Sequence, residues 1–173
     1  NPITVGSGGG AAECAGQAPG RAGGGAIHIT TSGTLTIDGE ISANGQNATS
    51  GVSSLGCRSG GGAGGSIWLD VDTIAGTGNI SLIGGTGGLN SDMGGAGGGG
   101  RLSVQYNTDS YTGLVDSYGG QSPSSRKGEN GTSVFEDKVN QHLYVYTSQR
   151  WEPTSANEFE NLFPNVIDMT ISA

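Results

Sequence analysis

The stretch Gly61–Val71, which reads GGAGGSIWLDV, contains both elements from which most of the chain is built. Five small residues, four of them glycine, lead directly into a run in which Ile67, Leu69 and Val71 occupy every second position. Apolar residues at a period of two are typical of a β-strand with one buried face. We therefore expect a strand that starts where a glycine cluster ends.

The same pair of elements recurs on both sides of this stretch. Ile67 lies 40 residues after Ile27, and Leu102 lies 35 residues after Ile67; a glycine cluster precedes each of the three. A second short strand follows in every copy, centred on Ile41, Ile80 and Val115. Repeats of this length are typical of arrays whose units stack on one another, because a single unit cannot bury its own apolar face.

These repeats predict an all-β fold: a glycine-rich parallel β-solenoid of about three coils, followed by a C-terminal strand pair and extension. Residues 1–146 would form the solenoid, and residues 147–173 a connector and a terminal strand. Stacking in register would place Ile27, Ile67 and Leu102 in one interior row. A second interior row would hold Ile29, Leu69 and Val104. The outward-facing row would hold His28, Trp68 and Ser103. The glycine clusters would form either turns or extended three-fold helices packed side by side.

Two further strand regions are expected after the composition changes at Gly120. The alternating runs Thr132–Phe135 and Leu143–Tyr146 indicate a strand pair that closes the glycine-rich part. The final run, Phe163–Ile171, is apolar enough for another strand, whose edge needs a partner. We expect either that the polypeptide continues beyond this run or that the strand docks on another copy.

The composition excludes several classes of protein. Glycine supplies 36 of 173 residues in clusters, and only five residues are proline, which excludes a collagen triple helix. The apolar residues gather in short alternating runs, which disfavours a disordered linker. Seven basic and fifteen acidic residues give a net charge of −8, which disfavours nucleic acid and anionic membrane surfaces as partners. No apolar run is long enough for insertion into a membrane.

The two cysteines occupy similar positions in successive repeats. Cys14 precedes Ile27 by 13 residues, and Cys57 precedes Ile67 by 10. Stacked strands lie about 4.8 Å apart, within the usual Cα separation of a disulfide, so the spacing predicts a Cys14–Cys57 bridge. The alternative is a pair of buried free thiols.

Three sequons, at Asn47, Asn79 and Asn130, predict an N-glycosylated chain. Asn47 and Asn130 lie in polar, glycine-rich stretches typical of loops, whereas Asn79 adjoins an expected strand. The first residue is Asn1 rather than Met, so we expect a processed chain or a part of a longer one. These features together favour a secreted or cell-surface location.

Residues with catalytic or metal-binding potential are few. Asp70 and Asp72 share one face of an expected strand, as a calcium-ligand pair or a polysaccharide-cleaving acid pair would. A solvated outer face fits the same spacing, and the neighbouring repeats supply no further carboxylates. The only histidines, His28 and His142, have no second ligand at metal-binding spacing. We therefore expect no metal, no cofactor and no enzymatic activity.

Aromatic residues offer a better lead for recognition. Trp68, Tyr106, Tyr111 and Tyr118 would supply exposed stacking surface for sugars or partner chains. The alternative is that these rings only cover the faces of the solenoid.

The units Gly61–Leu69, Gly39–Gly45 and Ala96–Leu102, with Gly131–Phe135 at the end, resemble glycine-rich β-solenoid repeats of large surface proteins in bacteria and protists. The resemblance covers residues 20 to 146 and implies an adhesin, a cell-wall component or a filament protein. We expect a structural component of an extracellular filament, sheath or surface layer, whose partners are copies of itself or similar proteins. The alternatives are a carbohydrate-binding adhesin and, less favoured, an enzyme of the polysaccharide-lyase kind.

Overall fold

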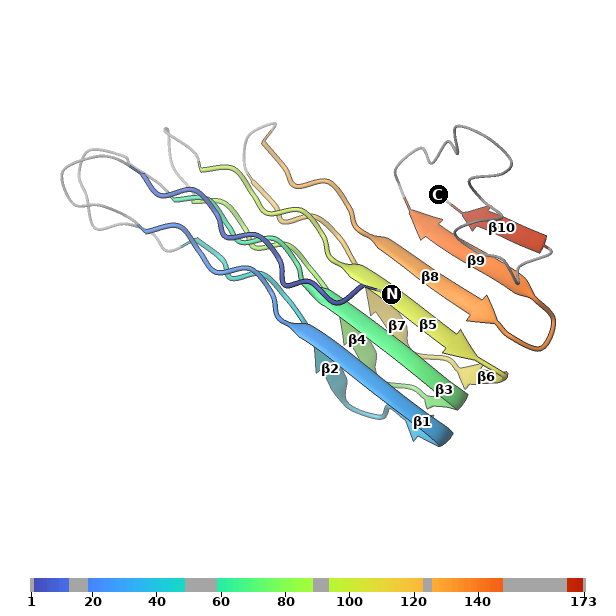
Figure 1. The fold of residues 1–173 in the computed structure, drawn as a ribbon. Helices are drawn as coiled ribbons and strands as arrows, with labels where there is room; N and C mark the ends of the chain where they lie inside the picture. The colour runs from blue at the N-terminus through green and yellow to red at the C-terminus, as the bar shows by residue number, and fades with distance from the viewer. Residues whose placement is uncertain are drawn as a thin grey trace.

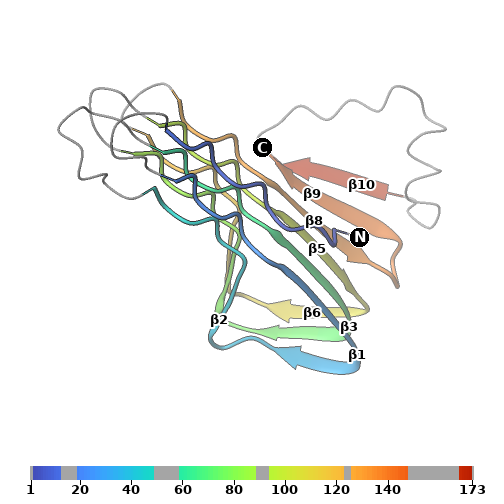
Figure 2. The same cartoon turned by 60° about the vertical axis from the view of Figure 1, so that its left-hand side comes forward.

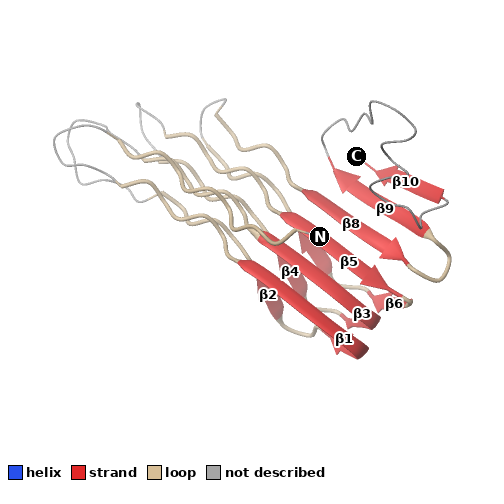
Figure 3. Cartoon of the chain, viewed as in Figure 1, coloured by secondary structure: helices blue, strands red, loops and turns tan. Residues whose placement is uncertain are grey.

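The computed structural model describes residues 2–12, 19–48, 59–88, 94–122, 126–147 and 168–172. These residues contain strands but no helix, and hence no helix that could cross a membrane (Figures 1 and 3). The strands are β1 (Ala26–Thr36), β2 (Glu40–Ser42), β3 (Ser66–Gly76), β4 (Asn79–Ser81), β5 (Arg101–Tyr106), β6 (Thr108–Tyr111), β7 (Leu114–Asp116), β8 (Thr132–Asp137), β9 (His142–Thr147) and β10 (Asp168–Ser172).

The strands form two sheets. The larger sheet has seven strands in the order β1-β3-β5-β8-β9-β10, with β6 also paired to β3. The smaller sheet has the order β2-β4-β7 and lies behind the first three strands of the larger one (Figure 1). Fully buried aliphatic side chains from both sheets pack in one cluster, which includes Ile67 and Leu69 of β3 and Ile80 of β4. The core therefore lies between the two sheets.

The predicted pairing of the repeats is confirmed. Ile27 lies opposite Ile67, and Ile67 lies opposite Leu102. The second interior row and the outward-facing row are also in register, with Ile29, Leu69 and Val104 in one, and His28, Trp68 and Ser103 in the other. Period-two alternation specifies this register because a slip of one residue would expose every buried side chain.

The predicted parallel β-solenoid is wrong. The long and the short strand of each repeat belong to separate sheets, so the chain does not wind through one continuous β-coil. The strands β8 and β9 are antiparallel, with Phe135 opposite Tyr144, and this reversal interrupts the parallel order of the larger sheet. The glycine-rich segments that connect the strands lie outside both sheets (Figure 3).

The glycine-rich segments instead form a bundle of extended chains that run side by side (Figure 2). Gly61 and Gly64 donate hydrogen bonds to carbonyls of the segment 94–100, whereas Gly62 and Gly65 donate to the segment 43–48. Ala63 donates in a third direction, to Ser7. A donor direction that recurs at every third residue is that of an extended helix with three residues per turn. Of the two predicted arrangements, the three-fold helices are therefore correct.

Glycine is required in this bundle because the backbones approach too closely for a side chain. A Cβ atom added at Gly62 would lie 1.9 Å from the carbonyl oxygen of Ala22, and one added at Gly97 would lie 2.0 Å from that of Gly62. In both cases the obstacle is backbone, which cannot rotate away. The same close approach allows neighbouring helices to share hydrogen bonds in several directions.

The C-terminal part matches the expected strand pair. The strands β8 and β9 form an antiparallel hairpin, as Thr132–Phe135 and Leu143–Tyr146 predicted. The terminal strand β10 pairs in parallel with β9 of its own chain, so that Asp168 lies opposite His142. The terminal strand thus has one partner within the chain and forms the last described strand of the larger sheet, so docking of its other edge on another copy stays a prediction.

A candidate binding groove and a polar outer face

A groove of about 880 Å³ opens where the smaller sheet stops and the larger one continues. The smaller sheet ends at β7, whereas the larger sheet extends through β8 and β9. Within the described ranges, no fourth short strand covers the inner faces of β8 and β9. We call this space the tyrosine groove, and it is lined by Tyr106, Asn107, Thr108, Asp109, Tyr111, Gly113, Val115, Ser117, Tyr118, Asn130, Gly131, Ser133, Phe135, Asp137, Asn140, Tyr144 and Tyr146.

Strand register brings the aromatic side chains of one wall together. Phe135 lies opposite Val104 of β5 and so continues the interior row of the larger sheet. Tyr144 lies opposite Phe135 in the hairpin, and directly opposed residues of an antiparallel pair share a face. Tyr146 packs edge-on against Phe135, with ring centroids 5.8 Å apart. This wall is therefore a contiguous aromatic surface.

The opposite wall is formed by β6, β7 and the segment that follows β7. The hydroxyl of Tyr111 lies 2.9 Å from the carbonyl oxygens of both Gly78 and Leu114, which holds the ring against the end of the smaller sheet. Tyr118 is 56% exposed, and Tyr146 on the other wall is 47% exposed. The groove thus presents accessible tyrosine rings on both of its walls.

The turn between β8 and β9 is held by a carboxylate. Asp137 accepts hydrogen bonds from the backbone N–H groups of Val139 and Asn140 at 3.0 and 2.9 Å, and from the Asn140 side chain at 2.7 Å. Burial by itself would raise the pKa of Asp137, but these hydrogen bonds outweigh it and hold the pKa below its ordinary value. Asp137 therefore remains a carboxylate at neutral pH.

The groove has a negative electrostatic character. Among the described residues that line it, Asp109 and Asp137 are acidic, and none is lysine or arginine. Burial, followed by the nearby carboxylates of Asp109 and Asp137, raises the pKa of Tyr106 well above its ordinary value. Its phenol therefore stays protonated and remains a hydrogen-bond donor at the buried end of the groove.

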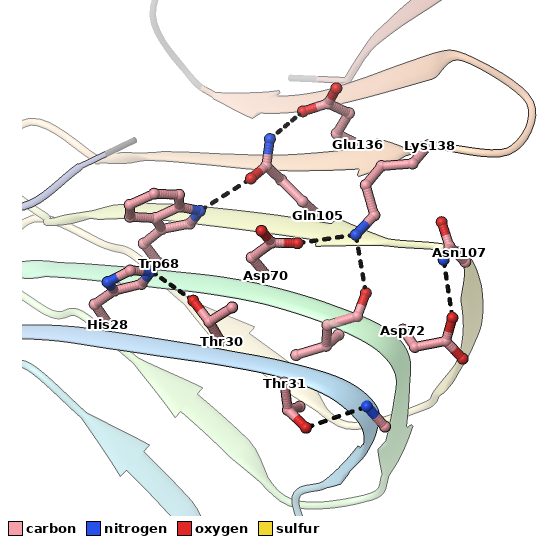
Figure 4. A network of polar contacts seen from close by, with 12 residues as sticks. His28, Thr30, Thr31, Trp68, Asp70, Asp72, Gln105, Asn107, Glu136 and Lys138 are labelled. Carbon is pink, nitrogen blue, oxygen red and sulfur yellow. Dashed lines mark hydrogen bonds and ion pairs between the residues drawn. The ribbon is translucent and has the colours of Figure 1, made fainter.

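The outer face of the larger sheet carries a second group of polar and aromatic side chains (Figure 4). His28 stacks on Trp68, with ring centroids 3.9 Å apart and planes 5° from parallel. Trp68 donates its indole N–H to the side-chain oxygen of Gln105 at 3.1 Å. Gln105 in turn donates to a carboxylate oxygen of Glu136 at 2.6 Å. These contacts connect β1, β3, β5 and β8 through their side chains.

Asp70 and Asp72, the two carboxylates whose spacing also fits a calcium-ligand pair, belong to this outer face (Figure 4). Asp70 forms an ion pair with Lys138 at 2.8 Å, and Asp72 accepts a hydrogen bond from Asn107 at 2.8 Å (Figure 4). No group of three or more potential metal ligands occurs among the described residues. The two carboxylates therefore have protein partners on this face.

The structure separates the four predicted recognition residues. Tyr106, Tyr111 and Tyr118 line the tyrosine groove, whereas Trp68 lies on the outer face. Tyr106 is only 5% exposed, so the expectation that all four are exposed is wrong. The groove also contains Phe135, Tyr144 and Tyr146, which the sequence interpretation treated only as strand residues. Their period-two alternation was visible, but the face they share depends on the hairpin register.

The three sequon asparagines occupy different environments. Asn47 is exposed, and its side-chain oxygen accepts a hydrogen bond from the N–H of Thr86 at 2.8 Å. Asn79 is the first residue of β4, and its side-chain oxygen is buried. Asn130 lines the tyrosine groove and accepts a hydrogen bond from the N–H of Gly119 at 3.0 Å. Glycosylation of all three remains a prediction.

The predicted disulfide concerns residues outside the described ranges, because neither Cys14 nor Cys57 is described. The nearby segments are in contact, however. The N–H of Gly60 donates to the carbonyl oxygen of Gly10 at 2.8 Å. The bridge therefore remains a prediction, and Gly10 and Gly60, which lie four and three residues from the two cysteines, are side by side.

Comparisons with family models, with curated proteins and with solved structures find no match to this chain. Its function must therefore be inferred from its own residues.

Proposed function

We propose that this chain is a structural module of an extracellular filament, sheath or surface layer, and that it associates with further copies through the outer side of β1 and β2. The observation that carries this proposal is the incomplete burial of the first repeat. Ile27, Ile29 and Ile41 are only partly buried, whereas their counterparts in the second repeat are fully buried. Those counterparts, in register, are Ile67, Leu69 and Ile80.

An additional repeat stacked on β1 and β2 would complete this burial. Fully burying an aliphatic side chain contributes about 1.5–3 kcal/mol, so each half-buried one would gain about 1 kcal/mol from a neighbour. The strand β1 has eleven residues and lies at the edge of the larger sheet, and β2 lies at the edge of the smaller one. Such edges are templates for the addition of a strand from another chain.

The glycine bundle supports a structural role. The described glycine-rich segments bond to one another through their backbones, and these contacts need little side-chain chemistry. A module of this kind would act as a stiff spacer, because each extended helix is held by neighbours on several sides. An extracellular location remains part of the proposal and rests on the three sequons.

Sedimentation velocity over a range of protein concentrations tests the proposal, with electron microscopy of the same samples. We expect concentration-dependent association in the wild type and its loss in Ile29→Lys, because the new charge would be buried between copies. Leu114→Lys is the matched control, since Leu114 is 69% exposed and lies on β7, at the other edge of the smaller sheet. Circular dichroism establishes that both variants fold. A wild-type chain that stays monomeric at every concentration contradicts the proposal.

A further inference from the structure

We infer that the tyrosine groove is a binding site for a neutral oligosaccharide. This inference goes beyond the structural role proposed above and does not depend on it, because the groove lies beside β7, β8 and β9, away from the β1 and β2 edges. Three features of the groove carry it: accessible aromatic rings on both walls, fixed polar groups between them, and the absence of cationic side chains among the described residues of its lining.

The aromatic rings suit the apolar faces of sugar rings. The faces of a pyranose carry C–H groups, which pack against the electron-rich face of an aromatic ring, while its hydroxyl groups project from the edge. Tyr118 and Tyr146 are about half exposed and come from opposite walls. A sugar chain entering the groove would therefore meet stacking surface on either side.

The polar groups of the groove match the hydroxyls of a sugar, each of which both donates and accepts hydrogen bonds. Asp109 accepts a hydrogen bond from the N–H of Tyr111 through one carboxylate oxygen at 2.9 Å, which orients the side chain and leaves its other oxygen for a ligand. Asn140 is held by Asp137 at the hairpin turn. Tyr106, which is largely buried, also lines the groove, and its protonated phenol is a hydrogen-bond donor. Such a combination of aromatic lining and a few oriented polar groups is typical of small-ligand sites.

The charge of the groove selects against acidic ligands. Asp109 and Asp137 would repel the carboxylates or sulfates of acidic glycans, and the part of the lining that the structure describes contains no lysine or arginine to offset that repulsion. The volume of about 880 Å³ lies within the range usual for ligand pockets. A neutral oligosaccharide therefore fits both the charge and the size of the space.

A peptide strand is the main rival occupant, because β7 is an edge strand beside the groove. That strand has only three residues, so an added peptide would gain a short ladder. Strands in globular proteins are most often five or six residues long. The aromatic walls would also be superfluous for backbone pairing. These observations favour the sugar.

The test uses the full chain, produced without N-linked glycans, on a glycan array that presents neutral, sialylated and sulfated oligosaccharides together. Calorimetric titration with the best-bound neutral oligosaccharide follows. We expect Tyr118→Ala and Tyr146→Ala each to weaken binding about tenfold, which is the loss of one stacking contact. Leu114→Ala and Trp68→Ala are matched controls, because neither residue lines the groove. Both should bind like the wild type.

Several outcomes would overturn the inference: no neutral glycan bound, binding confined to acidic glycans, or binding lost in Trp68→Ala but retained in both tyrosine variants. If an extended peptide instead competes with the sugar and binds Tyr118→Ala as well as it binds the wild type, that outcome would assign the groove to strand addition and overturn the inference. Circular dichroism and thermal unfolding of each variant separate loss of binding from loss of fold. Self-association is measured without glycan, so failure of the structural proposal and failure of this inference are distinguishable.

Discussion

The substitution Gly62→Ala is the most direct test of the glycine bundle. The added Cβ would lie 1.9 Å from the carbonyl oxygen of Ala22 and 2.5 Å from its carbonyl carbon. Real Cβ atoms do not approach backbone this closely, so the two chains must separate. Gly62 donates to Gln46 and accepts from Gly85, and Gln46 donates to Ala22, so the separation disturbs at least three hydrogen bonds.

The expected magnitude follows from these bonds. Each backbone hydrogen bond contributes about 1 kcal/mol net, and three disturbed bonds amount to about 3 kcal/mol. Alanine restricts the unfolded chain more than glycine does, which restores about 0.4–1 kcal/mol. The net destabilisation is therefore about 2–3 kcal/mol. For a chain of this size it corresponds to a fall in Tm of about 4–12 °C.

The matched control is Gly25→Ala. A Cβ at Gly25 would meet no atom within 4 Å, and its φ lies outside the left-handed region. This variant should be as stable as the wild type or slightly more stable, because only the unfolded-state effect operates. Thermal unfolding followed by far-ultraviolet circular dichroism measures both variants. Equal Tm values for Gly62→Ala and Gly25→Ala would refute the close packing of the three-fold helices.

Three further predictions follow from individual residues. If Cys14 and Cys57 are bridged, reduction should raise the intact mass by two hydrogens. The reduced chain should also lose on the order of 4 kcal/mol of stability in the chain-entropy model. An unchanged mass on reduction rules the bridge out. The pKa of Asp137 is lowered in the folded chain, so the carboxylate stabilises the fold above its unfolded value of 3.8, and this contribution is lost as the pH falls through the lower folded pKa. Asp137→Ala should therefore reduce the urea midpoint at neutral pH but not at a pH below both pKa values, and an equal reduction at both would contradict this linkage. Asn130 lines the tyrosine groove, so a glycan on it should weaken binding of a neutral oligosaccharide. In protein from a glycosylating host, Thr132→Ala removes this sequon and should restore the binding. Equal binding with and without the glycan would show that Asn130 lies outside the occupied part of the groove.

Local alternation was sufficient to predict the strands of the repeats and their partners in the next repeat, but not β6 or the pairing of β10 with β9. Ile67, Leu69 and Val71 mark one face of a strand without reference to the rest of the chain, and repetition at 40 and 35 residues identifies the neighbouring strands. The register followed because only one alignment buries all of these side chains. The observed pairs Ile27 with Ile67 and Ile67 with Leu102 are therefore consequences of pattern alone.

The arrangement of the glycine segments was not available from such a pattern. A glycine cluster fits a turn, a close crossing or an extended helix equally well, because glycine has few steric restrictions. What selects the three-fold helix is the presence of neighbours on several sides, such as the segments 43–48 and 94–100 around Gly62 and Gly64. These segments remove much of each repeat from the sheets, which is why the predicted solenoid was wrong.

The composition and periodicity of this sequence determined that glycine clusters alternate with strands and that the strands of successive repeats pair in parallel. The sequence also indicated Tyr106, Tyr111 and Tyr118 as candidate recognition residues. Only the tertiary structure decided that the repeats divide into two sheets and that the larger sheet extends beyond the last strand of the smaller one. That difference in extent creates the tyrosine groove and adds Phe135, Tyr144 and Tyr146 to it. The physical reason is that alternation is a property of neighbouring residues, whereas a groove depends on which strand is missing from a sheet.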